Sequence, residues 1–123
     1  MPAAEIIQGA LNVPVGATAT VTGPDIVNTG ASGVKVVAVT TAIGTGSITV
    51  SIQGKDPASG TYYTILAGAA IVTNTTNVYT VFPGAPVAAN ASANDSLPAV
   101  WRVLVTANNA NPATYTVGFS TVD

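Results

Sequence analysis

Few side chains in this sequence could carry out chemistry. The chain has no histidine and no cysteine, and its lysines are Lys35 and Lys55. Nucleophilic catalysis needs an activating base, most often histidine, and a thiolate metal site needs cysteine. A Ser–Lys pair is the remaining route, but Lys55 falls in a turn sequence and Lys35 on an expected sheet face. We therefore expect no enzyme activity and no catalytic residues.

Paired carboxylates are the next candidates, because two of them can divide the acid and base roles of a reaction. Asp25, Asp56 and Asp95 lie in separate turn-like sequences, so each is interpreted as a turn or cap former. A calcium site needs several clustered oxygen ligands, and a loop site built from Asp95, Asn94 and Asn90 stays open as an alternative. The main expectation is that the chain holds no metal and no cofactor.

Charge is scarce along the whole chain. The 123 residues include 3 basic and 5 acidic ones, so 7% are charged, against about 25% in an ordinary soluble domain. The net charge of -2 leaves no basic patch to neutralise phosphates, so nucleic acid is not an expected partner. No apolar run approaches the roughly 18 residues of a membrane helix, so no membrane is expected either. Residues 1–7 lack the pattern of a signal peptide, and we expect the protein to be synthesised in the cytoplasm and left there.

Val, Ile, Thr and Tyr dominate the sequence, and they favour strands because branched and aromatic side chains pack well on a pleated surface. Ile48, Val50 and Ile52 alternate with polar residues at the period of two expected of a half-buried strand. Turn sequences separate seven such segments, at residues 17–22, 34–43, 47–53, 61–66, 78–82, 100–107 and 113–119. This spacing predicts an all-β fold, an antiparallel β-sandwich of the immunoglobulin-like or jelly-roll-like kind, with a small barrel as the alternative.

Turn chemistry predicts how the segments connect. Gly44-Thr45-Gly46 and Asn108 to Pro112 are short links typical of hairpins. Asp56-Pro57 followed by Gly60 is also a turn sequence, because proline presets its φ and glycine tolerates a positive one. Residues 83–98, rich in Ala, Asn and Pro, are expected to cross between sheets. Three hairpins are thus expected, joining 34–43 to 47–53, 47–53 to 61–66, and 100–107 to 113–119.

The beginning of the chain differs from the rest. Residues 1–15 are apolar without alternation and are interrupted by Pro2, Gly9 and Pro14. They are predicted to form an extended N-terminal arm or a first strand laid along the domain. Residues 16–123 are predicted to form a single β-sandwich domain, since a chain of this length suits one compact domain.

The aromatic residues divide between core and surface. Trp101 alternates with Val103 and Val105, so it is predicted to lie in the core. Tyr62 and Tyr63 are adjacent in a strand and must point to opposite faces. One of them is therefore expected to be exposed and to serve an interface, because tyrosine carries a large apolar ring with a polar tip.

The missing charge itself suggests a role. Soluble domains usually spread charges over their surface, whereas protein interfaces are depleted of charge at their centres. A subunit with little charge anywhere is typical of one whose faces are buried against other protein. The alternative is a stable β domain whose surface is simply rich in hydroxyl groups.

An ordered series of motifs resembles small structural proteins of tailed bacteriophages, especially phages of actinobacteria. The resemblance covers about residues 34–119. It is carried by the stretch from Val50 to Leu66, which reads VSIQGKDPASGTYYTIL, and by Val81-Phe82-Pro83-Gly84, Asn94-Asp95-Ser96-Leu97-Pro98, Trp101-Arg102-Val103 and Tyr115-Thr116-Val117-Gly118.

This resemblance implies a head decoration (cement) protein. Such proteins commonly sit as homotrimers at threefold positions on the outer capsid surface of the virion, where they bridge copies of the major capsid protein and stabilise the shell. The arm with Ile6, Ile7, Leu11 and Val13 is then expected to dock on the shell or on a neighbouring protomer, and Tyr62 to lie in an interface. The alternative is a tail or fibre β-sandwich module that binds a host surface glycan or another tail protein.

Overall fold

The chain folds into two packed β-sheets. The computed structural model describes residues 21–109, 111 and 113–122 in full and residues 8–17 as backbone. Ten strands lie in this part of the chain: β1 (Gln8–Ala17), β2 (Val21–Thr22), β3 (Ile26–Val27), β4 (Gly33–Ala42), β5 (Ile48–Lys55), β6 (Tyr62–Ala67), β7 (Thr76–Phe82), β8 (Ser92–Asn94), β9 (Val100–Ala107) and β10 (Ala113–Val122). Among the same residues, no helix is long and apolar enough to span a membrane.

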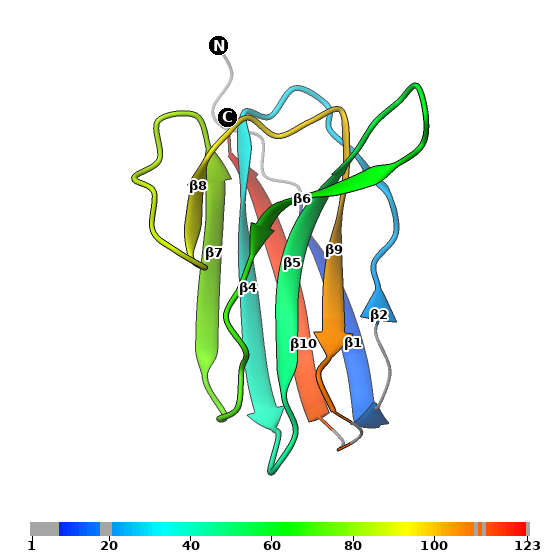
Figure 1. Cartoon of the computed structure of the whole chain (residues 1–123), viewed down its shortest axis with the longest axis vertical. Helices are drawn as coiled ribbons and strands as arrows, with labels where there is room; N and C mark the ends of the chain where they lie inside the picture. Colours follow the sequence, from blue (N-terminus) through cyan, green and yellow to red (C-terminus); the bar gives the residue numbers. More distant parts are fainter. Residues whose placement is uncertain (1–7, 18–20, 110, 112, 123) are drawn as a thin grey trace.

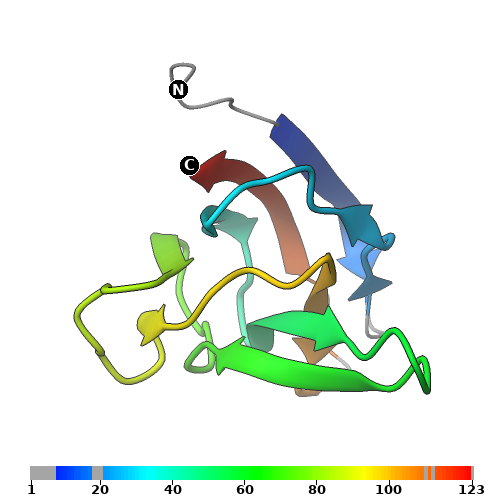
Figure 2. The ribbon, with the colours of Figure 1, turned by 90° about the horizontal axis from the view of Figure 1, so that it is seen from above.

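The strands form two layers (Figures 1 and 2). Sheet A has the order β1-β10-β4-β7-β8, and sheet B has the order β2-β9-β5-β6 with β3 also paired to β9. All pairings are antiparallel except β7 with β8, which is parallel. The predicted all-β sandwich is therefore confirmed, with more strands than the seven expected because several short segments add to the sheet edges.

The core lies between the layers, and strand alternation builds it. On β5 the buried side chains include Ile48, Val50 and Ile52, as predicted. Trp101, with Val103 and Val105 beyond it on β9, is fully buried, and its ring meets Phe119 edge-on at 4.9 Å between centroids. The core position of Trp101 is thereby confirmed.

The hairpin between β5 and β6 is confirmed, and local hydrogen bonds explain it. The backbone N–H of Asp56 donates to the Thr61 carbonyl at 2.8 Å, which closes the loop. The Asp56 carboxylate accepts from the Ala58 N–H and the Ser59 hydroxyl inside the turn. Gly60 takes a φ of 76°, in the left-handed region that glycine tolerates best. Asp56 is thus the turn former that the sequence predicted.

The other two expected hairpins are wrong. β4 belongs to sheet A and β5 to sheet B, and likewise β9 belongs to sheet B and β10 to sheet A. The chain therefore changes from one sheet to the other at each of these links, at the ends of the strands (Figure 1). The apolar faces of the linked strands bury each other across the layers, as the Trp101–Phe119 contact shows, and turn sequence alone does not distinguish that arrangement from a hairpin.

Three boundaries also differ from expectation. The predicted strand 17–22 is divided, because Ala17 ends β1 and Val21 begins β2. Residues 83–98 contain the short strand β8 beside β7, so the crossing to sheet B takes place only between β8 and β9. Residues 8–17 form the edge strand of sheet A, paired with β10, so the first-strand alternative describes this segment.

Candidate functional site

A group of polar side chains lies on the outer face of sheet B. It consists of Asp25, Gln53, Lys55, Tyr62 and Arg102, called here the Tyr62 cluster. Gln53 pairs in register with Arg102, and Lys55 with Tyr62. Because directly paired residues of an antiparallel ladder share one face, three neighbouring strands bring these four side chains together. Asp25 joins them from the link between β2 and β3.

Hydrogen bonds and ring contacts hold the cluster together. The Tyr62 hydroxyl donates to Asp25 Oδ1 at 2.6 Å, and Lys55 Nζ donates to Asp25 Oδ2 at 3.1 Å. The Arg102 guanidinium lies over the Tyr62 ring, 3.4 Å from its centroid, and Arg102 Nε donates to Gln53 Oε1 at 2.8 Å. Lys55 Nζ lies 5.5 Å from the same centroid. Tyr62 therefore contacts both cations of the cluster.

The electrostatics follow from these contacts. The Tyr62 hydroxyl, and after it the Lys55 ammonium, hold the pKa of Asp25 below its usual value by stabilising the carboxylate. In return, the hydrogen bond and the charge of Asp25 raise the pKa of Lys55. Both oxygens of the Asp25 carboxylate therefore accept a hydrogen bond, one from Tyr62 and one from Lys55. This is a correction to the expectation that Asp25 serves its local turn, because its partners come from β5 and β6.

The chemistry available in the cluster is recognition. The guanidinium is the one group of the cluster with a forked set of donors, and such a fork matches a carboxylate or phosphate. No group of three or more His, Cys, Asp or Glu that could hold a metal occurs among the described residues. The loop residues of the alternative calcium site are otherwise engaged: Asn94 Oδ1 accepts from the Gly84 N–H, and Asp95 Oδ1 from the Ser96 N–H.

The outer face of sheet A is different in character. Its central positions are occupied by small and β-branched residues that pair in register across β10, β4 and β7. Val37, for example, lies between Gly118 and Val78, and the Val78 side chain is 46% exposed. We call this set the sheet A outer face: Lys35, Val37, Val39, Thr76, Val78, Thr80, Thr116 and Gly118. Lys35 is the only charged residue in it.

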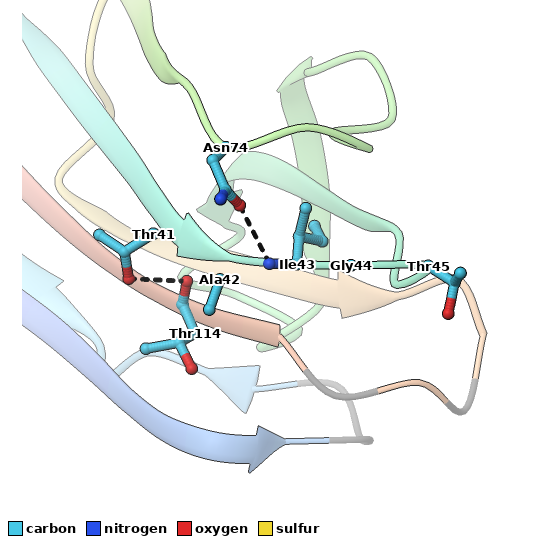
Figure 3. Close-up of a pocket in the computed structure, with 7 residues that line it drawn as sticks. All are labelled: Thr41, Ala42, Ile43, Gly44, Thr45, Asn74 and Thr114. Carbon is cyan, nitrogen blue, oxygen red and sulfur yellow. Dashed lines mark hydrogen bonds between the residues drawn. The ribbon is translucent and has the colours of Figure 1, made fainter.

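A hollow of about 450 Å³ opens where β4 leads into β5 (Figure 3). Asn74 Oδ1 accepts from the Ile43 N–H at 3.0 Å, and the Thr41 hydroxyl donates to the Thr114 carbonyl at 3.4 Å. The Thr114 hydroxyl is buried without a hydrogen-bond partner. The full lining is Thr41, Ala42, Ile43, Gly44, Thr45, Asn74 and Thr114. It carries hydroxyl and amide groups and no titratable side chain, so it can hydrogen-bond a polar molecule without activating it.

The predicted interface residues are spread over the fold. Ile6 and Ile7 lie outside the described residues. Leu11 and Val13 lie on β1, where their backbones pair with those of Val117 and Tyr115. Tyr62 lies on β6, the opposite sheet's edge strand, so the structure does not bring it together with Leu11 and Val13. Of the tyrosine pair, Tyr62 is half-buried on the outer face, and Tyr63 is 46% exposed.

Sequence reasoning missed four members of the Tyr62 cluster as parts of a site, namely Asp25, Gln53, Lys55 and Arg102. A signal for two of them was present, because Gln53 and Arg102 occupy the polar positions of two strongly alternating strands. What was lacking was the pairing of β5 with β9 and its register, which no local pattern supplies. Asp25 gave no signal, since its partners lie far along the chain.

Comparison with known proteins adds little. No protein family matches the chain, and no curated protein matches it either. Among solved structures, it is similar to the crystal structure of the Yersinia pseudotuberculosis-derived mitogen, at 12% identity over 98% of this chain and 88% of that one, with a TM-score of 0.44. A similarity this distant carries no argument about function.

Proposed function

We propose that the chain is a structural virion protein: a decoration (cement) protein that binds the outer surface of a phage head and stabilises the shell. The observation that carries this proposal is the sheet A outer face, a β-sheet surface whose eight described residues include one charge, Lys35. An exposed sheet surface of valine and threonine with so little charge is typical of a contact with other protein, because interface centres are poor in charge.

The partner in this proposal is the major capsid protein. Burial of the Val37, Val39 and Val78 surface would contribute at about 25 cal/mol per Å², offset in part by the cost of association. A homotrimer at a threefold position would contact several capsid subunits at once, so the contacts would add as avidity. The motif resemblance supports the trimer and its position on the outer capsid surface.

The first test is the number of copies of this chain in purified particles, measured by quantitative mass spectrometry against the major capsid protein. A decoration protein is expected at hundreds of copies, near parity with the shell. A few to a few tens of copies would instead assign the chain to the tail, and its complete absence from particles would overturn the virion role.

The tail or fibre module with a glycan ligand is less well supported. Sugars commonly stack on an open aromatic face, but Arg102 already covers one face of the Tyr62 ring at 3.4 Å. The hollow at Thr41 to Thr45 has hydroxyl and amide groups but no aromatic residue. A glycan array is the direct check, and we expect it to show no binding.

A further inference from the structure

Arg102 is held in place by its neighbours on the outer face of sheet B. It is the only arginine of the chain. Its guanidinium stacks on Tyr62 at 3.4 Å, and its Nε is bonded to Gln53 at 2.8 Å. Tyr62 comes from β6 and Gln53 from β5, so two neighbouring strands fix one side chain. Much of the rotamer entropy that an arginine loses on binding is therefore already lost in the free protein.

The two terminal Nη groups of Arg102 remain available. Among the residues that the structure describes, neither Nη atom has a hydrogen-bond partner, while Nε has one in Gln53. The carboxylate of the same cluster, Asp25, is bonded to Tyr62 and Lys55 instead. A rigid guanidinium thus presents a pair of parallel donors outward, which is the geometry that receives a carboxylate in two hydrogen bonds.

The charge of the cluster indicates which anion fits. Lys55 and Arg102 contribute two positive charges and Asp25 one negative charge, so the cluster is net +1 in a chain of net charge -2. A planar, singly charged carboxylate matches the guanidinium fork and neutralises the +1 charge of the cluster, whereas a doubly charged phosphate would leave a net negative charge beside Asp25. The neighbouring outward positions on β6 and β9 carry Thr64, Leu104 and Thr106, which are uncharged and can exclude water around the contact.

We propose that the Arg102–Tyr62 stack is an anchor for a single Asp or Glu side chain of a neighbouring protein subunit. Arginine and tyrosine are among the residues enriched at the energetic centres of protein interfaces, and here they are already in contact in the free chain. The inference rests on the proposed function only for the identity of that neighbour. Within an assembly it would give the charge-poor chain one directional contact on sheet B, in addition to the apolar contact of sheet A.

The test is a titration of isotope-labelled protein, followed by NMR at the Arg102 Nε–H and the Tyr62 ring. The probe is a blocked Gly–Glu–Gly peptide, and the matched probe is Gly–Gln–Gly, which has the same shape without the charge. Inorganic phosphate and glucuronate form two further arms. We expect saturable shifts at Arg102 with the glutamate peptide and none with the glutamine peptide. Glucuronate and phosphate are expected to bind more weakly than the glutamate peptide.

Three variants make the result specific. In the Arg102 variants, binding is followed at the Tyr62 ring. Arg102→Gln is expected to abolish the shifts there, and Arg102→Lys, which keeps the charge and the stem but not the fork, is expected to weaken binding about tenfold. Lys35→Gln removes an equal charge from sheet A and is expected to leave binding unchanged. The proposal would be overturned if the unmodified protein showed no shift at Arg102, or if the glutamine peptide bound as well as the glutamate peptide. It would also be overturned if phosphate or glucuronate bound more tightly than the glutamate peptide, or if Arg102→Lys bound that peptide as well as the unmodified protein. None of these outcomes depends on the number of copies in particles, so the two proposals fail separately.

Discussion

Arg102 lies on β9 and Tyr62 on β6, yet the guanidinium carbon stands 3.4 Å from the centroid of the tyrosine ring. Strand β5 runs between them in sheet B, and its Gln53 bonds the same guanidinium. The contact therefore ties together the outer surfaces of three strands. Because Tyr62 also donates to Asp25, the ring links the cation to the carboxylate that balances it.

Replacing Tyr62 with Phe isolates that link. The ring and its stack on Arg102 are retained, while the hydrogen bond to Asp25 is lost. The Tyr62 hydroxyl is the largest single cause of the lowered pKa of Asp25, and Lys55 lowers it through both a hydrogen bond and its charge. Tyr62→Phe and Lys55→Met are therefore each expected to raise that pKa, and an NMR pH titration of the Asp25 carboxyl measures both shifts. An unchanged pKa in Tyr62→Phe would contradict the hydrogen bond between Tyr62 and Asp25.

The lowered pKa of Asp25 also predicts that the stability of the fold depends on pH in the acid range. A carboxyl whose pKa is lowered by folding contributes stability above its unfolded pKa, and that contribution is lost as the pH falls through the folded value. Asp25 and Asp56 both have lowered pKa values, Asp56 because Ser59 and the Ala58 N–H donate to it. The free energy of unfolding should therefore fall at acid pH, and the fall should be smaller in Tyr62→Phe. Urea unfolding at a series of pH values gives both curves.

At alkaline pH the buried tyrosines are expected to limit stability. Burial raises the pKa of Tyr79 and of Tyr115, because the phenolate is poorly solvated in the core. A group whose pKa is raised by folding contributes stability below its unfolded pKa and loses it as the pH rises through the folded value. Absorbance titration should show these two tyrosines ionising later than free tyrosine, together with unfolding followed by circular dichroism. Ionisation of all four tyrosines in the native state would contradict their burial.

The sequence alone predicted a sandwich of two β-sheets, but it did not predict how the strands of the two sheets are connected. Alternation placed Val50, Trp101 and Val103 in the core because a period of two is a local property of each strand. Whether a short link continues one sheet or crosses to the other depends on which apolar faces meet, and that is not local. For the same reason Gln53 and Arg102 could be recognised as outward residues, but their contact with Tyr62 required the register of three strands.

Substitutions of Trp101 measure how much the core between the two sheets contributes to stability. Trp101 is fully buried, its ring meets Phe119 at an interplanar angle of 82°, and its indole N–H has no hydrogen-bond partner. Trp101→Ala is expected to cost about 3–5 kcal/mol of unfolding free energy, measured by urea denaturation. Trp101→Phe should cost less, because it also removes an unpaired buried donor. In a double-mutant cycle, Phe119→Leu should couple to Trp101 by about 0.5–1.5 kcal/mol, and additive effects would contradict the ring contact.

Gly33 marks a close approach between β4 and β7. A Cβ on Gly33 would overlap the Val81 carbonyl and the Phe82 Cβ, which backbone pairing holds in place. A Cβ on Gly54 would meet the far end of the Tyr63 ring at 2.6 Å and Pro98 Cγ at 2.8 Å. Both are side-chain atoms, and the Tyr63 side chain is 46% exposed and can move. Gly33→Ala should therefore lower the Tm more than Gly54→Ala, with an overpacking cost of about 1–3 kcal/mol. If the two variants lower the Tm equally, the backbone around Gly33 can move apart at little cost, which would contradict the prediction.

The proposed docking surface can be tested with one kind of substitution at two places. Val78→Asp introduces a charge at the centre of the sheet A outer face, where the valine is 46% exposed. Val87→Asp introduces the same charge in the connection from β7 to β8, where the valine is 77% exposed. Both variants should fold, because both positions are exposed in the free chain. Val87→Asp should change the stability by about 0.5 kcal/mol or less, and Val78→Asp should cost about 1 kcal/mol, because aspartate is a poor strand former.

The two variants should differ when they are mixed with phage heads stripped of this chain and sedimented. An unpaired carboxylate buried at the centre of an interface loses its hydration without gaining a partner, so Val78→Asp should bind the heads at least about tenfold more weakly than the unmodified chain. Val87→Asp lies off the sheet A outer face and should bind as the unmodified chain does. If Val78→Asp is folded and binds equally well, the docking surface is not the sheet A outer face, and a loss in Val87→Asp alone would place the contact at the β7 to β8 connection instead.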